Sequence, residues 1–374
     1  MLFSSPLYGV LALAAALFCR MLGVFLVLPV AALLVTDFPG SSPFAAGLVL
    51  GGYGITQALM QIPTGILADR WGKKTVLLIA LALFAGGSFI AAAGESVYEI
   101  IIGRLLQGSG AVAAVSAAWI SDIAPAERRA PAMAAFGAVI ALAFVVSLFA
   151  APILAAAYQL NGIFAITGWL GVISFIFVLS LPAPAITRPT ANVAATLRTL
   201  LANRPLLKIG GGAFILHYAL ATLFFILPTN LTLALADHWQ VYLASFVAAL
   251  PPAIWLIMRV EKQPHLCLSL AIGSLFIGFV VLLWSTQTII AVIALFFFFS
   301  GFTALEAALP AMAAKAAAAP DRAAAMGVVM TCEFSGVFCG GILAGTLAVF
   351  LDGQATIVII CLLLVVWLFT IKEK

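Results

Sequence analysis

The sequence has few charged residues. Lys and Arg number 17 and Asp and Glu number 13 among 374 residues, so charged side chains make up 8% of the chain and hydrophobic residues make up 65%. In a soluble globular protein about a quarter of the residues are charged. Too few polar residues are therefore present to build a cytosolic enzyme or a nucleic-acid-binding surface. We expect an integral membrane protein embedded in the lipid bilayer, with almost no domain outside it and no nucleic-acid partner.

Several chemical patterns are also missing. The five cysteines lie in apolar segments, and no pair of them shows the spacing of metal ligands. HExxH, GxSxG and clustered Asp motifs do not occur. A signal peptide would have a basic segment before its apolar run, and the first apolar run of this chain has none. The sequence thus predicts no metal site, no cofactor, no disulfide framework and no enzymatic activity.

Long apolar runs are abundant. A bilayer-spanning helix needs about 20 apolar residues, and runs of this order alternate with turn residues such as Asp37-Phe38-Pro39-Gly40, Gly94-Glu95-Ser96 and Asn161-Gly162. The runs predict an all-α integral membrane fold of twelve transmembrane helices, at 7–35, 44–67, 75–94, 98–121, 132–157, 162–181, 207–233, 239–258, 265–284, 288–312, 324–350 and 355–371.

These helices form two groups of six. We expect an N-terminal six-helix bundle at 1–182, a basic cytoplasmic linker at 183–206 and a C-terminal six-helix bundle at 207–374. The linker contains Arg188, Arg198 and Arg204, and it has room for a short surface helix around 193–202.

The basic residues predict the orientation. Fifteen of the 17 Lys and Arg fall in the loops after even-numbered helices or at the C-terminus, and the other two, Arg20 and Arg104, lie inside apolar runs. By the positive-inside rule the basic side faces the cytoplasm. We therefore expect both termini in the cytoplasm.

Weak internal similarity relates the two bundles. Residues 129–133 (Arg-Ala-Pro-Ala-Met) and 322–326 (Arg-Ala-Ala-Ala-Met) are 193 positions apart, and Val27-Leu28-Pro29 matches Ile226-Leu227-Pro228. Two repeats of the same orientation are typical of transporters that hold a substrate site between the repeats.

Two motifs carry a family resemblance. Residues 65–74 read Gly-Ile-Leu-Ala-Asp-Arg-Trp-Gly-Lys-Lys and resemble the G-x-x-x-D-R-x-G-R-K signature of the major facilitator superfamily, with Lys73 where Arg is usual. Residues 104–110, Arg-Leu-Leu-Gln-Gly-Ser-Gly, resemble its R-x-x-Q-G-x-G pattern. The resemblance covers the whole chain, and it implies the major facilitator fold and transport by alternating access.

Within that superfamily the sequence most resembles the proton-coupled drug efflux branch of bacterial inner-membrane proteins, through stretches such as 20–23, 27–30 and 237–239. Some of those proteins carry a soluble C-terminal domain, which we do not expect in a chain that ends at Lys374. The antiporter signature normally contains Gly-Pro, where this sequence has Ala151-Pro152. The resemblance nevertheless implies a multi-pass protein of the inner (cytoplasmic) membrane.

The resemblance also implies that the first, fourth, seventh and tenth helices line a central cavity. Each carries one ionisable residue inside the membrane, respectively Arg20, Arg104, His217 and Glu306. Such groups are costly in hydrocarbon and face the protein interior or water, so these four are the candidate substrate-cavity residues. The alternatives are a helix-to-helix pairing for Arg20 and a buried structural charge pair for Arg104.

Proton coupling has three candidate residues. Glu306 is the first, Glu333 on the eleventh helix is the second, and His217 is a candidate relay. The alternatives are a permanent pair of Glu306 with Lys315 or a Glu306 that faces the cytoplasmic vestibule, a helix-packing hydrogen bond for Glu333, and a neutral His217 bonded to a backbone carbonyl.

The loop after the second helix predicts a conformational latch. Asp69 is expected to meet the positive end of the eleventh helix while the inner side is closed, and so to favour the outward-open state. The latch and its surrounding charge network comprise Gly65, Asp69, Arg70, Gly72, Lys73, Lys74, Asp122, Arg128 and Arg129.

These features predict a secondary active transporter that uses the proton gradient to export small amphipathic compounds or drugs in exchange for protons. The alternative is a proton-coupled importer of a small metabolite such as an organic acid, with Arg20 binding its carboxylate. Outside transport, the alternatives are a channel or an integral membrane enzyme. We expect a monomer whose partners are lipid, protons and a small-molecule substrate.

Overall fold

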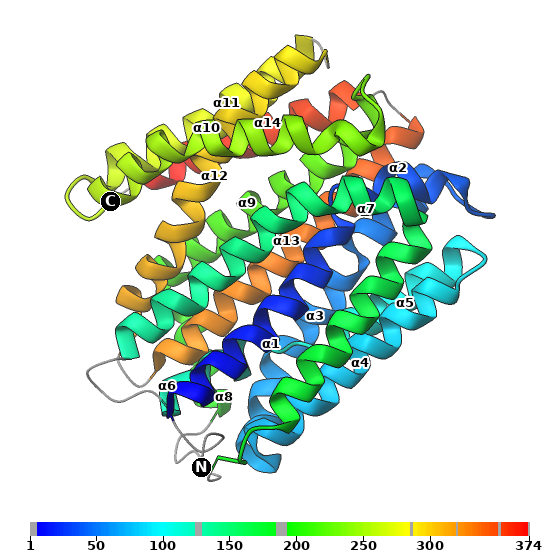
Figure 1. Ribbon diagram of the computed structural model, residues 1–374. Coiled ribbons are helices and arrows are strands. Elements are labelled where there is room, and N and C mark those ends of the chain that lie inside the picture. The colour runs from blue at the N-terminus through cyan, green and yellow to red at the C-terminus, as the bar shows by residue number, and fades with distance from the viewer. Residues whose placement is uncertain are drawn as a thin grey trace.

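The computed structural model describes residues 6–123, 129–184, 193–284, 287–318, 321–350 and 353–372, and in these ranges its regular secondary structure is helical (Figure 1). The helices, with two 3-10 turns labelled η, are α1 (Pro6–Val27), α2 (Ala31–Leu34), η2 (Val35–Asp37), α3 (Pro43–Trp71), α4 (Lys73–Ala93), α5 (Val97–Ser109), α6 (Ala113–Ile123), α7 (Arg129–Leu179), α8 (Val193–Ala202), α9 (Arg204–Asn230), η4 (Leu235–Asp237), α10 (His238–Arg259), α11 (Pro264–Trp284), α12 (Thr288–Ala316), α13 (Arg322–Phe350) and α14 (Gly353–Lys372).

Ten helical segments in the described ranges are long and apolar enough to cross a membrane. One of them covers 49 residues of α7, and Gln159, with φ 58° and ψ −172°, breaks the helical backbone inside it. α3 is a further helix, 29 residues long. The predicted all-helical fold with apolar spans is confirmed.

Two predicted helices are interrupted. The run 7–35 is predicted as one helix, but α1 ends at Val27, because Pro29 lacks the N–H that a continuing helix would need. The run 98–121 is also predicted as one helix, but it divides into α5 and α6 at residues 110–112. Gly110 has ψ 58° there, outside the α-helical range.

Predicted turns lie at or near their expected places. Gly40 has φ 79° after η2, and Glu99 Oε2 accepts hydrogen bonds from the backbone N–H groups of Glu95 (2.7 Å) and Ser96 (3.0 Å) at the start of α5. The turn within α7 lies at Gln159, two residues before the predicted Asn161-Gly162.

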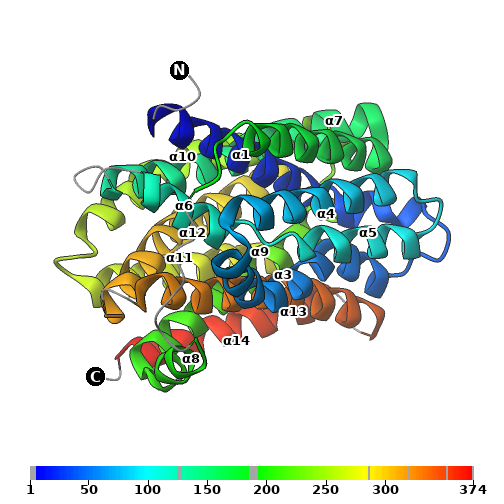
Figure 2. The same ribbon diagram turned by 90° about the horizontal axis from the view of Figure 1, so that it is seen from below.

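The loops define two ends of the helix assembly. We call the end with Arg70, Lys73 and Lys315 the basic end, and the opposite end, with Asp37 and Glu95, the acidic end. Figure 1 shows α10 and α14 inclined to α1 and α4, and Figure 2 gives the view from below, in which α3 and α13 lie side by side.

The hydrophobic core of the described residues is continuous toward the acidic end and divided toward the basic end. One buried cluster joins helices before α8 to helices after it, through side chains such as Val27, Val49, Phe144, Phe224 and Phe299. A second cluster, with Leu17, Leu77, Val115, Trp119 and Val178, is built only by helices before α8. The two sets of helices therefore pack on each other mainly near the acidic end.

The short helix expected around 193–202 is present as α8, while residues 185–192 of the linker lie outside the described ranges. Asn203 follows it and fixes the next corner. Its Oδ1 accepts from the Leu206 N–H in the first turn of α9 (3.1 Å), and its Nδ2 donates to the Ala316 carbonyl oxygen at the end of α12 (3.0 Å).

Candidate functional site

α3 and α13 are in backbone contact over their acidic-end halves. A Cβ added at Gly47 or at Gly341 would collide with the carbonyl oxygen of the other residue, and one at Gly345 would collide with the carbonyl oxygen of Pro43. Small residues permit such an approach between membrane helices. These contacts close the acidic end between the two helices.

The same two helices show no such close glycine contact toward the basic end. Gln61 Nε2 donates to Met330 Sδ across their contact (3.2 Å). Beyond it, a Cβ added at Gly65 or at Gly327 would meet no described neighbour within 4 Å. The space between the helices before and after α8 is therefore not bridged by close glycine contacts toward the basic end.

An aromatic cluster closes this space toward the acidic end. The Phe144 ring on α7 packs with the rings of Phe25 (5.3 Å between centroids), Phe224 (6.4 Å), Phe299 (6.3 Å) and Phe302 (6.0 Å). Three of these contacts are edge-on, a geometry that aromatic pairs favour. Phe144 thus seals α7 against α9 and α12.

Three of the predicted residues form one cluster next to these rings: His217 on α9, Glu306 on α12 and Glu333 on α13. His217 Nε2 is 3.7 Å from Glu306 Oε2, and both groups act electrostatically on Glu333. Counted from the basic-end termini of their helices, the three residues lie about 20, 15 and 16 Å deep at a rise of about 1.5 Å per residue. The cluster is therefore near mid-membrane depth.

The contact between His217 and Glu306 provides a place for a proton. His217 Nδ1 lies 3.1 Å from the Ala213 carbonyl oxygen, the bond expected of a donating Nδ1–H. Nε2 then faces the Glu306 carboxyl group, and this contact is attractive when a proton sits on either group. The Glu306 side chain is 42% exposed and the His217 side chain is 13% exposed, so the carboxyl group is the more accessible member of the pair.

Lys315 is not the partner of Glu306. Its Nζ pairs with Glu261 Oε1 at 2.6 Å, so the expectation of a permanent pair between Glu306 and Lys315 is wrong. Lys315 lies nine residues, about two and a half turns, beyond Glu306, at the basic end of α12. There it reaches the loop after α10 and holds the pKa of the Glu261 carboxyl group below its usual value by a hydrogen bond and by its charge.

Arg20 is fully buried among the helices before α8. Its Nη2 donates to Gln57 Oε1 (2.7 Å) and to the Gly110 carbonyl oxygen (3.3 Å), and its Nη1 contacts Met21 Sδ (3.1 Å). The guanidinium lies 5.4 Å from the centroid of the Phe84 ring. No carboxylate pairs with Arg20 in the described part of the chain.

Arg104 is also fully buried. Its Nε and Nη2 donate to the backbone carbonyl oxygens of Val49 (2.8 Å) and Leu50 (3.1 Å) on α3, and its Nη1 donates to Gln107 Oε1 (2.8 Å). The guanidinium also lies over the Tyr53 ring, 4.3 Å from its centroid. The expected structural charge pair is therefore wrong, because backbone and amide oxygens satisfy the guanidinium.

The predicted latch residues surround the turn between α3 and α4. Lys73 pairs with Asp122, and both act electrostatically on Asp69. Lys74 Nζ donates to the Leu179 carbonyl oxygen (2.9 Å) at the end of α7. Gly72 has φ 88°, a value that favours glycine.

Asp69 does not reach α13 in this conformation. Arg70 is exposed, and no hydrogen bond or ion pair joins Asp69 to α13 among the described residues. Arg128 lies outside the described ranges, as does the side chain of Arg129, the first residue of α7.

Sequence reasoning missed the polar residues of α3 that face these sites. Gln57 binds Arg20, Gln61 reaches Met330, and the Tyr53 ring packs on both Arg104 and Phe334 of α13. A signal was present, because two glutamines four positions apart in an apolar run lie on one helix face and need buried partners.

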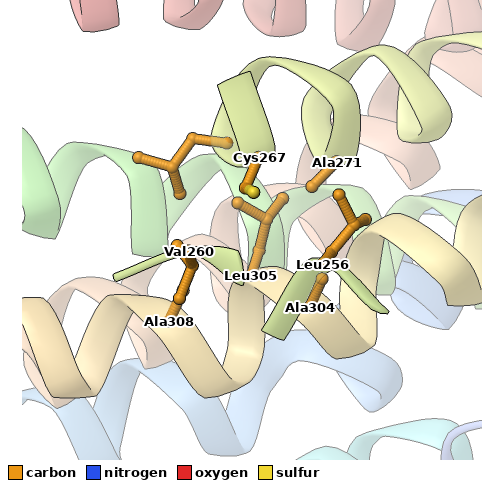
Figure 3. Close-up of a pocket in the computed structure, with 8 residues that line it drawn as sticks. Leu256, Val260, Cys267, Ala271, Ala304, Leu305 and Ala308 are labelled. Atoms are coloured by element: carbon orange, nitrogen blue, oxygen red, sulfur yellow. The ribbon is translucent and has the colours of Figure 1, made fainter. Parts of the chain in front are cut away.

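A small apolar pocket lies between α10, α11 and α12 (Figure 3). Its lining has no charged side chain and consists of Leu256, Val260, Cys267, Leu268, Ala271, Ala304, Leu305 and Ala308. It has no polar groups to orient a ligand, and we interpret it as a packing gap.

Known proteins resemble this chain in sequence and in structure. The profile of the Major Facilitator Superfamily matches residues 13–262. The inner membrane transport protein YajR of Escherichia coli (strain K12) is 36% identical over 368 residues, which cover 95% of this chain and 81% of YajR. The tetracycline resistance protein, class B, of Escherichia coli is 30% identical over 164 residues, which cover 42% of this chain and 40% of that protein.

Among solved structures, a bacterial homologue of the human lysosomal transporter Spinster, in an inward-facing and unoccupied conformation, matches with a TM-score of 0.76 at 13% identity. The match covers 98% of this chain and 96% of that one. With the profile match over most of the sequence and the identity to YajR over nearly all of it, the chain belongs to the major facilitator superfamily of membrane transporters, a family of transporters and not of enzymes.

Proposed function

We propose that this transporter exports small amphipathic cations in exchange for protons across a bacterial inner membrane. One observation carries the proposal: Glu306, Glu333 and His217 form a cluster at mid-membrane depth, between helices α9, α12 and α13. Ionisable groups inside a membrane protein mark ion and substrate pathways.

The proposed working parts are two six-helix bundles, at 1–182 and 207–374, joined by the linker at 183–206. α7 counts as two spans separated at Gln159, and α5 with α6 counts as one. The internal repeat supports this division, because Arg129 opens α7 and Arg322 opens α13 at equivalent places.

The basic end faces the cytoplasm in this proposal, by the positive-inside rule, and both termini lie there. The structure then corresponds to an inward-open state, since the glycine contacts of α3 with α13 and the Phe144 cluster close the other end. Alternating access would separate these contacts and bring Gly65 and Gly327 toward each other.

The charges within reach favour a cationic substrate. Glu306 is exposed, whereas Arg20 and Arg104 are fully buried and held by amide and carbonyl oxygens. An entering cation meets two carboxylates, and an anion would be repelled by them. The import of an organic acid bound by Arg20 is disfavoured for the same reason.

Exchange follows if protons and the substrate cation compete for the cluster. A cation that enters from the basic end displaces the proton shared by His217 and Glu306 or held by Glu333. After the transporter has changed to the state that is open at the acidic end, protons that enter from that end displace the cation. The substrate cation binds best to the ionised carboxyl groups, and a bound proton neutralises them. Each ligand therefore weakens the binding of the other by the same factor.

Asp69 would set the balance between the two states. Closure of the basic end would bring the first turn of α13 to the turn between α3 and α4, where its positive end would attract the carboxylate. Lys73 and Asp122 would then keep Asp69 in position.

The test uses purified protein reconstituted into liposomes. The liposome interior is acidic and the surrounding buffer is neutral, so that protons tend to flow outward. We expect a lipophilic quaternary ammonium dye to accumulate inside, while a dye of the same skeleton with a carboxylate does not. Protein-free liposomes and the double variant Glu306→Gln with Glu333→Gln should show no accumulation above leakage. Proton-driven movement of the anionic dye alone would favour acid import, and steady unitary currents would favour a channel.

A further inference from the structure

We propose that Arg20, Gln57 and the start of α6 form a binding site for a small monovalent anion, with chloride as its simplest occupant. The site lies within the helices before α8 and is separate from the cluster of Glu306 and Glu333. It does not depend on the direction or substrate of transport.

The first observation is an unneutralised positive charge. Arg20 is fully buried, and its described partners are an amide oxygen, a backbone carbonyl oxygen, a sulfur atom and an aromatic ring. Arg104, also a buried cation, interacts electrostatically with Arg20. A buried charge is costly unless an opposite charge accompanies it, so two neighbouring cations create a strong demand for an anion.

The second observation is a pair of unused hydrogen-bond donors. Arg20 Nε and Gln57 Nε2 are both buried, and neither has a hydrogen-bond partner. They belong to two side chains that are bonded to each other, because Gln57 Oε1 accepts from Arg20 Nη2 at 2.7 Å. A buried donor without an acceptor is unfavourable, and one anion can accept from both groups.

The third observation is the helix break at residues 110–112. Gly110 gives its carbonyl oxygen to Arg20 (3.3 Å), and α6 begins at Ala113, at most about 11 Å further along the chain. The first N–H groups of a helix have no partner within it and carry the positive end of the helix dipole. Ala111, Val112 and Ala113 are buried and have no side-chain oxygen to cap them, so the N-terminus of α6 adds to the positive potential around Arg20.

The chemistry of the site selects the ligand. The site offers three kinds of donor, from α1, α3 and the start of α6, and its titratable neighbours are Arg104 and the phenol of Tyr53. A metal cation is repelled, and a water molecule would fill hydrogen bonds without neutralising charge. Because Arg20 and Gln57 are both fully buried, a small inorganic anion suits the site better than the carboxylate of a bulky substrate. Its binding would hold α1, α3 and the break between α5 and α6 together.

The test compares unfolding temperatures of the purified full chain in detergent, in sodium chloride and in sodium gluconate of equal ionic strength. We expect saturating chloride to raise the unfolding temperature by about 2 to 4 °C, and bromide and formate to act similarly. The ³⁵Cl NMR signal should broaden on addition of the protein. An unfolding temperature that is the same in chloride and gluconate would overturn the proposal.

Variants separate the site from general salt effects. Gln57→Glu places a carboxylate beside Arg20, so it should lose the chloride response and be at least as stable in gluconate as the unchanged protein is in chloride. Arg20→Gln should also lose the response, and if it does not fold, Gln57→Glu still decides. Arg259→Gln removes a cation at the basic end, beside Trp255 (4.8 Å), and should keep the response.

Two results would count against the proposed ligand or site. A chloride response in Gln57→Glu equal to that of the unchanged protein would place the anion elsewhere. Stabilisation by benzoate without any response to chloride would assign the site to a substrate carboxylate and overturn the assignment to an inorganic anion.

Discussion

His217 joins the backbone of α9 to the carboxyl group of Glu306 on α12. Its Nδ1 lies 3.1 Å from the Ala213 carbonyl oxygen while its Nε2 lies 3.7 Å from Glu306 Oε2. The imidazole is thereby fixed in orientation by one nitrogen and offers the other to a titratable partner. We propose that the pair handles protons, a role to which an imidazole held in this orientation is suited.

Replacement of the imidazole tests that role. His217→Leu removes the imidazole that faces the Glu306 carboxyl group, and with it the proposed proton-accepting partner. Dye transport in proteoliposomes should then lose its normal pH profile while the protein remains folded. His217→Phe serves as an aromatic control for packing on Phe302, and an unchanged pH profile in both variants would show that His217 has only a structural role.

The contact of α3 with α13 predicts a sharp difference between glycines. Gly341→Val should destabilise this conformation by about 1 to 3 kcal/mol, because its side chain would collide with the Gly47 carbonyl oxygen and overpacking costs this much. Gly327→Ala on the same helix meets no described neighbour, and should be neutral or stabilising by about 0.5 to 1 kcal/mol. Thermal unfolding in detergent compares them, and equal effects would contradict the close approach.

Replacement of Arg104 by lysine should destabilise the protein, although both side chains are positively charged. Arg104→Lys retains the charge but cannot reach Val49, Leu50 and Gln107 at once. We expect a loss of about 1 to 3 kcal/mol, the cost of one buried polar group without its partner. Arg70→Lys, at an exposed position, is the control. If Arg104→Lys unfolds with the same midpoint as the unchanged protein, the carbonyl contacts are not important for stability.

Phe144 should matter both to stability and to tightness. Phe144→Ala removes a nearly buried ring from four aromatic contacts and should cost about 3 to 5 kcal/mol. Phe144→Leu keeps most of the volume and should cost about 1.5 kcal/mol or less. In liposomes we expect the alanine variant to leak protons without substrate. If liposomes with Phe144→Ala leak protons no faster than those with the unchanged protein, the sealing role of this ring is contradicted.

The sequence predicted the helices well because its apolar runs and its basic loops carry strong, local signals. The break at Gln159 lies near the turn predicted at Asn161-Gly162. The break at residues 110–112 was less visible, since Gly110, with its ψ of 58°, packs closely on the Ala80 carbonyl oxygen of another helix. The proline at position 29 was a readable signal that ends α1.

The sequence predicted the identity of the site residues better than it predicted which of them lie together. His217, Glu306 and Glu333 stood out as ionisable groups in apolar runs, but only the packing of α9, α12 and α13 brings them together. Arg20 and Arg104 were expected in the same cavity, and the structure instead buries both behind amide and carbonyl oxygens of the earlier helices. A sequence does not show which backbone oxygen atoms will accept hydrogen bonds. The carbonyl contacts that hold Arg20 and Arg104 away from the predicted cavity were therefore not predictable.

Competition between protons and a cation for one carboxyl cluster is the central claim, and proton release measures it most directly. A lipophilic cation is added to the purified protein in weakly buffered detergent solution, and the pH change is followed with a soluble indicator. We predict that the unchanged protein releases protons in proportion to cation bound, and that the double variant Glu306→Gln with Glu333→Gln releases none. Cation binding without any proton release from the unchanged protein would contradict the exchange mechanism.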